Sequence, residues 1–181
     1  MKFILWLLFG ILVIYMGYEA FVIEQRTPAF SLVKMEFAGS MSGKQMLRTW
    51  QQKTYGGQPL LAVARSNTRL DYLFILVYAA LLVMYSYLRM QREHRYRLNV
   101  LLRLNLLLAL VAGAADMIEN GLILYNIRHV ADEGLYFCAF IPSTIKWALL
   151  AWCLLVYLIS RLSTPDQKFE KPLPLNLITK S

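Results

Sequence analysis

Four long apolar runs constrain this chain more than any other feature. They extend over residues 3–23, 71–88, 98–125 and 135–159, and each is close to or above the roughly 20 residues that a helix needs to cross the hydrocarbon of a bilayer. Hydrophobic residues make up 58% of the 181 residues, more than a soluble chain usually carries. The sequence therefore predicts an all-α integral membrane bundle of four transmembrane helices, in one domain of residues 1–163.

The first run resembles a signal peptide in its position, since Lys2 precedes an apolar stretch. Signal-peptide cleavage requires small residues at positions −3 and −1. For cleavage after Ala20, the −3 position would be Tyr18, whose side chain is too large. We therefore expect residues 3–23 to form a retained anchor helix.

Basic residues predict how the helices are oriented. The link between the second and third runs carries Arg89, Arg92, Arg95 and Arg97, and short loops rich in arginine stay in the cytoplasm. Four spans then place both termini in the cytoplasm and residues 24–70 on the extracytoplasmic side. The remaining residues form a cytoplasmic tail, 164–181, which its three prolines predict to be extended or disordered.

The extracytoplasmic segment 24–70 carries local patterns of its own. Residues 33–37 alternate apolar and charged side chains, which predicts a short strand. Ser42 followed by Gln45 is a capping-box pattern that predicts an amphipathic helix reaching about Lys53. Its apolar side would carry Met46, Leu47 and Trp50, and the residues 55–59 that follow predict a turn. The segment is interpreted either as a lid over an intramembrane cavity or as packing that covers the end of the bundle.

Acidic residues in the third run are the strongest candidates for a functional site. Asp116, Glu119 and Asn120 have the spacing i, i+3 and i+4, so they share one face of a helix. Ionised groups in hydrocarbon are costly and require a partner or water. Lys146 in the fourth run lies about 15 Å from the same end of its helix, at 1.5 Å per residue, and is the predicted partner.

Further polar and aromatic residues fall at the same membrane depth. They are Asp71, Tyr72 and Tyr78 in the second run, Ser143 and Trp147 beside the lysine, and Glu19 in the first run. Their shared depth predicts a partly hydrated pocket that opens outward and binds a ligand through these residues and the cluster above. The alternative is a structural network in which Lys146 neutralises one carboxylate and the other polar groups reach water or headgroups.

Several classes of function are excluded by the residues available. None of the four runs contains a histidine, so we expect no metal site and no cofactor. There is no nucleophile-elbow serine pattern and no phosphate-binding glycine loop. Cys138 and Cys153 are too far apart for a redox pair and are expected to be reduced thiols. The net charge of +8 is interpreted as a signal of orientation, with no nucleic acid as partner.

Short motifs in the chain resemble those of uncharacterised small bacterial four-helix inner-membrane proteins. The resemblance runs from about residue 33 to 150 and is carried by residues 35–40 with Trp50, by LDYLFILVY at 70–78, by AADMIEN at 114–120 and by Lys146. It implies a location in the bacterial inner membrane and carries no activity. A fainter architectural likeness is to the EXPERA group of sterol-isomerase and sigma-2-receptor-like proteins, which implies an intramembrane pocket with acidic residues.

Three hypotheses for function remain open at this level. The leading one is a protein that binds a lipid or amphiphilic small molecule in the pocket, where a cationic or hydroxylated headgroup would suit the carboxylates. The second is an intramembrane lipid-modifying enzyme with Asp116 or Glu119 as acid or base. The third is an accessory subunit that holds a membrane-protein partner or forms a homo-oligomer, with the carboxylates in a structural role.

Overall fold

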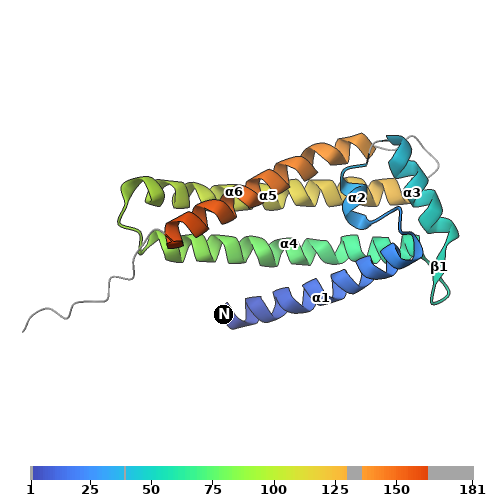
Figure 1. The fold of residues 1–181 in the computed structure, drawn as a ribbon, viewed down its shortest axis with the longest axis horizontal. Helices are drawn as coiled ribbons and strands as arrows, with labels where there is room; N and C mark the ends of the chain where they lie inside the picture. The colour runs from blue at the N-terminus through green and yellow to red at the C-terminus, as the bar shows by residue number, and fades with distance from the viewer. Residues whose placement is uncertain (1, 39, 130–135, 163–181) are drawn as a thin grey trace, which may run out of the picture.

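Four long helices dominate the computed structural model, which describes residues 2–38, 40–129 and 136–162. In chain order the elements are α1 (Lys2–Arg26), α2 (Leu32–Glu36), α3 (Ser40–Gln52), β1 (Thr54–Tyr55), β2 (Gln58–Pro59), α4 (Leu60–Met90), α5 (Tyr96–Arg128) and α6 (Tyr136–Leu162). The long helices α1, α4, α5 and α6 run side by side along the longest axis (Figure 1). Each contains a stretch long and apolar enough to cross a membrane, which confirms the four predicted helices. The predicted tail, 164–181, lies outside the described residues.

The long helices extend beyond the apolar runs that predicted them. α4 begins at Leu60 instead of residue 71, so it contains 31 residues and is about 46 Å long at 1.5 Å per residue. The charged residues Arg65 and Arg69 lie just before the apolar run at 71–88, so hydrophobicity alone does not predict a helix there. Arginine is nevertheless a good helix former, and α4 includes both residues. One consequence is that Asn67 lies on the same helix as the candidate site residues.

The segment between α1 and α4 packs over one end of the bundle, which we call the capped end (residues 27–59) (Figure 1). The predicted strand at residues 33–37 is wrong, because residues 32–36 form α2, whose first turn is capped by Ser31 accepting a hydrogen bond from the Lys34 backbone. A run of five residues is too short for alternation to distinguish strand from helix. The amphipathic helix is confirmed as α3, although it begins two residues before the predicted Ser42.

Packing at the capped end follows the predicted apolar side of α3. Met46, Leu47 and Trp50 are all buried, and the indole of Trp50 donates a hydrogen bond to Thr27 Oγ1 at 3.2 Å. A two-residue turn at Gly56 and Gly57 then reverses the chain between β1 and β2, and both glycines have positive φ, as a tight hairpin requires. The capped end is thus a folded layer attached to the bundle.

α5 lies between α4 and α6 and makes close contacts with both. At Gly113, an added Cβ would lie 3.4 Å from Cγ2 of Ile75 and 3.6 Å from Cβ of Ala79. This glycine therefore lets α4 and α5 approach closely, as small residues do in membrane helices. α1 packs against α4 on the side away from α5 (Figure 1), so α1 and α6 flank α4 without packing tightly against each other.

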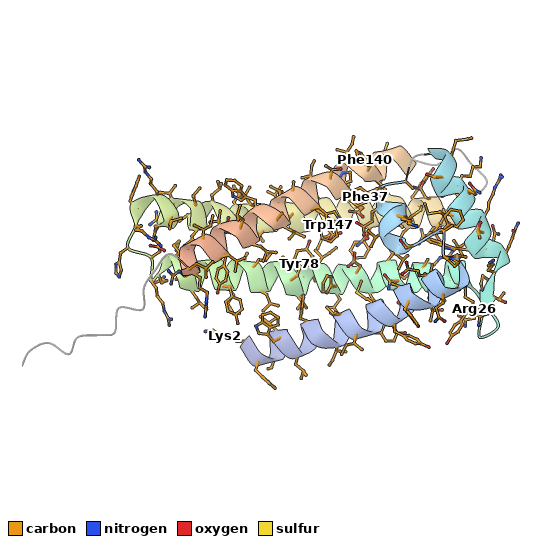
Figure 2. All side chains as sticks on the ribbon, viewed as in Figure 1. Lys2, Arg26, Phe37, Tyr78, Phe140 and Trp147 are labelled. Atoms are coloured by element: carbon orange, nitrogen blue, oxygen red, sulfur yellow. The ribbon has the colours of Figure 1, made fainter. Side chains whose placement is uncertain are left out.

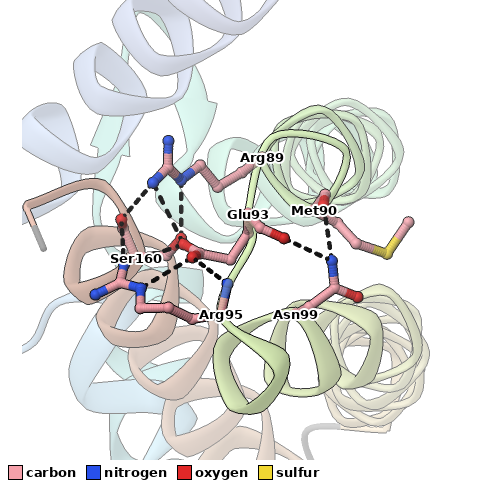
Figure 3. A network of polar contacts seen from close by, with 6 residues as sticks. All are labelled: Arg89, Met90, Glu93, Arg95, Asn99 and Ser160. Atoms are coloured by element: carbon pink, nitrogen blue, oxygen red, sulfur yellow. Dashed lines mark hydrogen bonds and ion pairs between the residues drawn. The ribbon is translucent and has the colours of Figure 1, made fainter. Parts of the chain in front are cut away.

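A cluster of polar side chains, which we call the clasp (Arg89, Glu93, Arg95 and Ser160), joins α4, the α4–α5 turn and α6 at the opposite end of the bundle (Figure 3). Glu93 accepts hydrogen bonds from Arg95 Nε at 2.9 Å and from Ser160 Oγ at 2.7 Å. Arg89 donates to Ser160 Oγ at 2.8 Å. The hydrogen bonds from Arg95, supported by Ser160, lower the pKa of Glu93 from its ordinary 4.5 to about 2.

Candidate functional site

Lys146 is the centre of the candidate site. Its ammonium lies 2.8 Å from Asp116 Oδ1, 2.9 Å from Glu119 Oε2 and 3.3 Å from Glu36 Oε2. Lys146 and Asp116 are each 4% exposed and Glu119 is fully buried. The spacing along α5 brings the two acidic residues to one face, and α6 presents the lysine to them. The pairing predicted from the sequence is therefore present, and it includes a third carboxylate.

Two residues of α4, Tyr78 and Asp71, form hydrogen bonds with the acidic face of α5. Tyr78 donates a hydrogen bond from its hydroxyl to Asp116 Oδ2 at 2.9 Å. Asn120 donates to Asp71 Oδ2 at 2.8 Å. Asp116 therefore has both carboxylate oxygens occupied, one by Lys146 and one by Tyr78. These contacts fix the side chain of Asp116 in one position.

Glu36 is the member of the site that the sequence did not predict. It is the last residue of α2, and its carboxylate accepts a hydrogen bond from Trp147 Nε1 at 2.9 Å in addition to the contact with Lys146. Ser143 also donates to the backbone carbonyl of Glu36 at 3.1 Å. Nearby, the rings of Phe37 and Phe140 meet edge to face at 6.1 Å (Figure 2). α2 is thus attached to α6 directly above the charged cluster.

A cavity of about 880 Å³, which we call the slot, adjoins this cluster. Its four charged lining residues, Glu36, Asp71, Asp116 and Lys146, lie toward the capped end together with Asn67, Tyr78 and Trp147, and Ser86 is a polar lining residue at the other end. The rest of the lining is mostly apolar or aromatic and comes from α1, α2, α4 and α6. Trp6, Tyr85 and Tyr157 lie at the other end of the slot. The slot is therefore amphipathic along its length.

The predicted ligand-binding residues fall into two groups. Asp116, Lys146, Asp71, Tyr78 and Trp147 line the slot. The other five are outside its lining, and they are Glu119, Asn120, Tyr72, Ser143 and Glu19. Glu119, Asn120 and Ser143 bind or position residues that line the slot, whereas the hydroxyl of Tyr72 lies 3.4 Å from the backbone carbonyl of Met117.

Glu19, one of the predicted ligand-binding residues, does not line the slot. It is only 6% exposed and accepts a hydrogen bond from Asn67 Nδ2 at 3.2 Å. Asn67 also donates to the backbone carbonyl of Met16 at 3.0 Å. Glu19 therefore joins α1 to α4, and it is Asn67 that faces the slot. No sequence pattern indicated this pair, because residue 67 lay before the predicted start of the helix.

The charges of the cluster do not balance among the described residues. Glu36, Asp71, Asp116 and Glu119 supply four carboxyl groups, and the one ammonium among them belongs to Lys146. Glu119 Oε1 is buried and accepts no hydrogen bond from any residue that the structure describes. Within the described ranges, no three His, Cys, Asp or Glu side chains are arranged to hold a metal ion. The cluster therefore has spare capacity to accept hydrogen bonds or positive charge.

The two cysteines take no part in this site. Both are free thiols: Cys153 is buried and Cys138 is exposed. Asn105 Nδ2 donates a hydrogen bond to the backbone carbonyl of Cys153 at 3.0 Å. This contact connects α5 to α6 on the clasp side of the candidate site.

Comparisons with protein-family models, with curated proteins and with solved structures gave no match to this chain. What points to a function is therefore the geometry of the slot and its charged cluster.

Proposed function

We propose that this chain is a bacterial inner-membrane protein that binds a lipid or another amphiphile in the slot. The observation that carries the proposal is one cavity of about 880 Å³ that joins a charged cluster to an apolar lining. Binding sites for small molecules commonly combine an apolar wall with a few convergent polar groups. The headgroup would lie against Asp116 and Lys146, and the hydrocarbon chain would follow the slot toward Tyr85.

The length of the slot suits an extended hydrocarbon chain. Its lining on α4 runs from Asn67 to Ser86, a helical rise of about 28 Å. The hydrocarbon core of a bilayer is about 30 Å thick. Because α1 and α6 flank α4 without close packing, the slot lies where a lipid enters from the side. A compact soluble metabolite would leave most of this apolar lining unused.

The charge balance favours a headgroup that donates hydrogen bonds or carries an amine. Four carboxyl groups against one ammonium leave an excess of negative charge if all are ionised, which is costly at membrane depth. A cationic headgroup would offset this excess at Asp71 and Asp116, both of which line the slot, and a hydroxylated headgroup would donate hydrogen bonds to them. An anionic headgroup would be repelled by the same carboxylates.

The arginines of the clasp support the orientation predicted from the sequence. They lie in and beside the short α4–α5 turn, and such turns remain in the cytoplasm. On this orientation both termini are cytoplasmic and the capped end is extracytoplasmic, with α2 above the polar end of the slot. The headgroup would then come from the outer leaflet of the inner membrane.

We expect Asp116→Asn to reduce the amount of bound amphiphile about tenfold, because it removes one of the carboxylate charges that line the slot while keeping the volume of the side chain. The measurement is native mass spectrometry of the wild type and the variant, both purified in the same mild detergent. Glu24→Gln is the matched control, since Glu24 is exposed at the end of α1. Equal loading of the wild type and Asp116→Asn with bulk lipid alone would refute the proposal.

A second pair of variants tests the slot without changing any charge. Gly17 lines the slot, and an added Cβ there would meet no atom within 4 Å. Gly17→Trp should therefore be accommodated by the fold and should displace the amphiphile by filling the slot. Gly10 is equally open but lies outside the slot lining, so Gly10→Trp should retain the ligand. Loss from both variants, or from neither, would contradict the assignment of the slot.

A further inference from the structure

A second cavity lies on the other side of the seam between α1 and α4. It has a volume of about 690 Å³ and shares no lining residue with the slot. We call it the basic groove, and its characteristic lining residues are Arg65, Ser66 and Arg69 from α4 with Ile11, Leu12 and Tyr15 from α1. The groove therefore combines two guanidinium groups with an apolar wall.

The two arginines have no acidic partner among the residues that the structure describes. No ion pair connects Arg65 or Arg69 to a described carboxylate, and the nearby carboxylate of Glu19 accepts its hydrogen bond from Asn67. Arg65 Nε is buried and has no hydrogen-bond partner within the described ranges. The two arginines are four residues apart on one helix face, a spacing at which like charges repel. An anion between them would accept the missing hydrogen bond of Arg65 Nε and would reduce the repulsion between the two positive charges.

The position and chemistry of the groove select a phospholipid among possible anions. Arginine presents a planar fork of donors that matches phosphate oxygens. Arg65 and Arg69 lie on α4 just before the predicted span 71–88, where headgroups would meet the helix. Ile11 and Leu12 continue the groove along α1 with apolar side chains, which suit an acyl chain. A free phosphate ion would make no use of this wall.

We infer that the basic groove binds one anionic phospholipid, with its phosphate held by Arg65 and Arg69 and an acyl chain lying against Ile11 and Leu12. The slot and the groove would then select opposite headgroup charges on the two sides of α1. A lipid in the groove would fill the space beside α1, the one long helix that packs chiefly on α4. This inference does not depend on the ligand proposed for the slot.

The test is a lipid titration of the full chain in mild detergent, followed by native mass spectrometry. The probes are phosphatidylglycerol and phosphatidylcholine with identical acyl chains. We expect the wild type to bind phosphatidylglycerol more tightly, and we expect Arg65→Gln with Arg69→Gln to weaken that binding about tenfold, because two charge-assisted contacts are lost. Binding of phosphatidylglycerol that is unchanged in this variant would overturn the inference.

Three controls distinguish a phospholipid site in the groove from a general effect of charge and from a site for a free ion. Arg92→Gln with Arg97→Gln removes the same charge at the far end of the bundle, and an equal loss there would show a general charge effect and overturn the inference. Displacement of the lipid by millimolar inorganic phosphate would also overturn it, since the groove would then be a site for the free ion. Asp116→Asn should leave phosphatidylglycerol binding intact whether or not it empties the slot.

If the double glutamine variant does not fold, the variant Arg65→Lys with Arg69→Lys decides the question. Lysine keeps both charges but lacks the planar fork. We expect the lysine variant to bind phosphatidylglycerol more weakly than the wild type does. Wild-type affinity in the lysine variant would overturn the role assigned to the guanidinium groups.

Discussion

Replacing Lys146 with methionine is expected to lower the free energy of unfolding by about 3–5 kcal/mol, the largest effect of any single substitution proposed for this protein. Lys146 is 4% exposed, and its ammonium contacts Asp116, Glu119 and Glu36 within 3.3 Å. Methionine fills a similar volume but leaves three carboxyl groups without their positive partner. The measurement is thermal or denaturant unfolding of the purified protein in mild detergent, followed by circular dichroism.

Two further variants test whether this loss comes from unpaired charge. Lys53→Met is the matched control, because Lys53 is exposed and its ammonium contacts only a backbone carbonyl among the described residues, so its effect should stay within about 0.5 kcal/mol. Combining Lys146→Met with Asp116→Asn and Glu119→Gln should recover much of the stability, since neutral groups cost less to bury. A triple variant as unstable as Lys146→Met alone would mean that lost packing, not charge, causes the effect.

Acidification is expected to remove about 3 kcal/mol of stability through Glu93, given a folded-state pKa of about 2 against an ordinary 4.5. The folded clasp favours the ionised carboxylate, so this stability is fully present above pH 4.5. It is lost progressively as the pH falls from about 4.5 through 2, because the unfolded chain takes up the proton first. About half of it should be gone near pH 3.

The measurement compares the wild type with Glu93→Gln in unfolding experiments at about pH 7 and about pH 3. The advantage of the wild type over this variant should shrink by about 2 kcal/mol between the two pH values. Because other carboxyl groups titrate equally in both proteins, the comparison isolates Glu93. Glu24→Gln should show no such change, since Glu24 is exposed. A wild-type advantage that is constant with pH would show that the clasp does not hold the carboxylate ionised.

The charged pair at the core of the candidate site was predictable from the sequence because it follows from local geometry. Helical periodicity places Asp116 and Glu119 on one face, and the cost of charge in hydrocarbon requires a partner at the same depth. Lys146 was the one basic residue deep within the fourth run. The contacts at 2.8 and 2.9 Å confirm this pairing.

Glu36 and Glu93 were missed for different physical reasons. Glu36 belongs to a run of five residues whose alternation is typical of a strand. Its contact with Lys146 joins segments that are far apart in the sequence, and local periodicity carries no information about such contacts. Glu93 lies among arginines in a turn, where the sequence predicts only membrane orientation. Its role depends on Ser160, which α6 brings back to the same end of the bundle.

The amino-acid sequence by itself determined the four long helices, the acidic face of α5 and the apolar side of α3, because each follows from hydrophobic length or from a repeat of three to four residues. Tertiary structure alone decided that α2 meets Lys146 through Glu36, that Asn67 binds Glu19, and that the slot and the basic groove lie on opposite sides of the α1–α4 seam. The reason is physical: cavities and long-range ion pairs depend on how helices pack against one another, and helix packing is not encoded in the periodicity of any single helix.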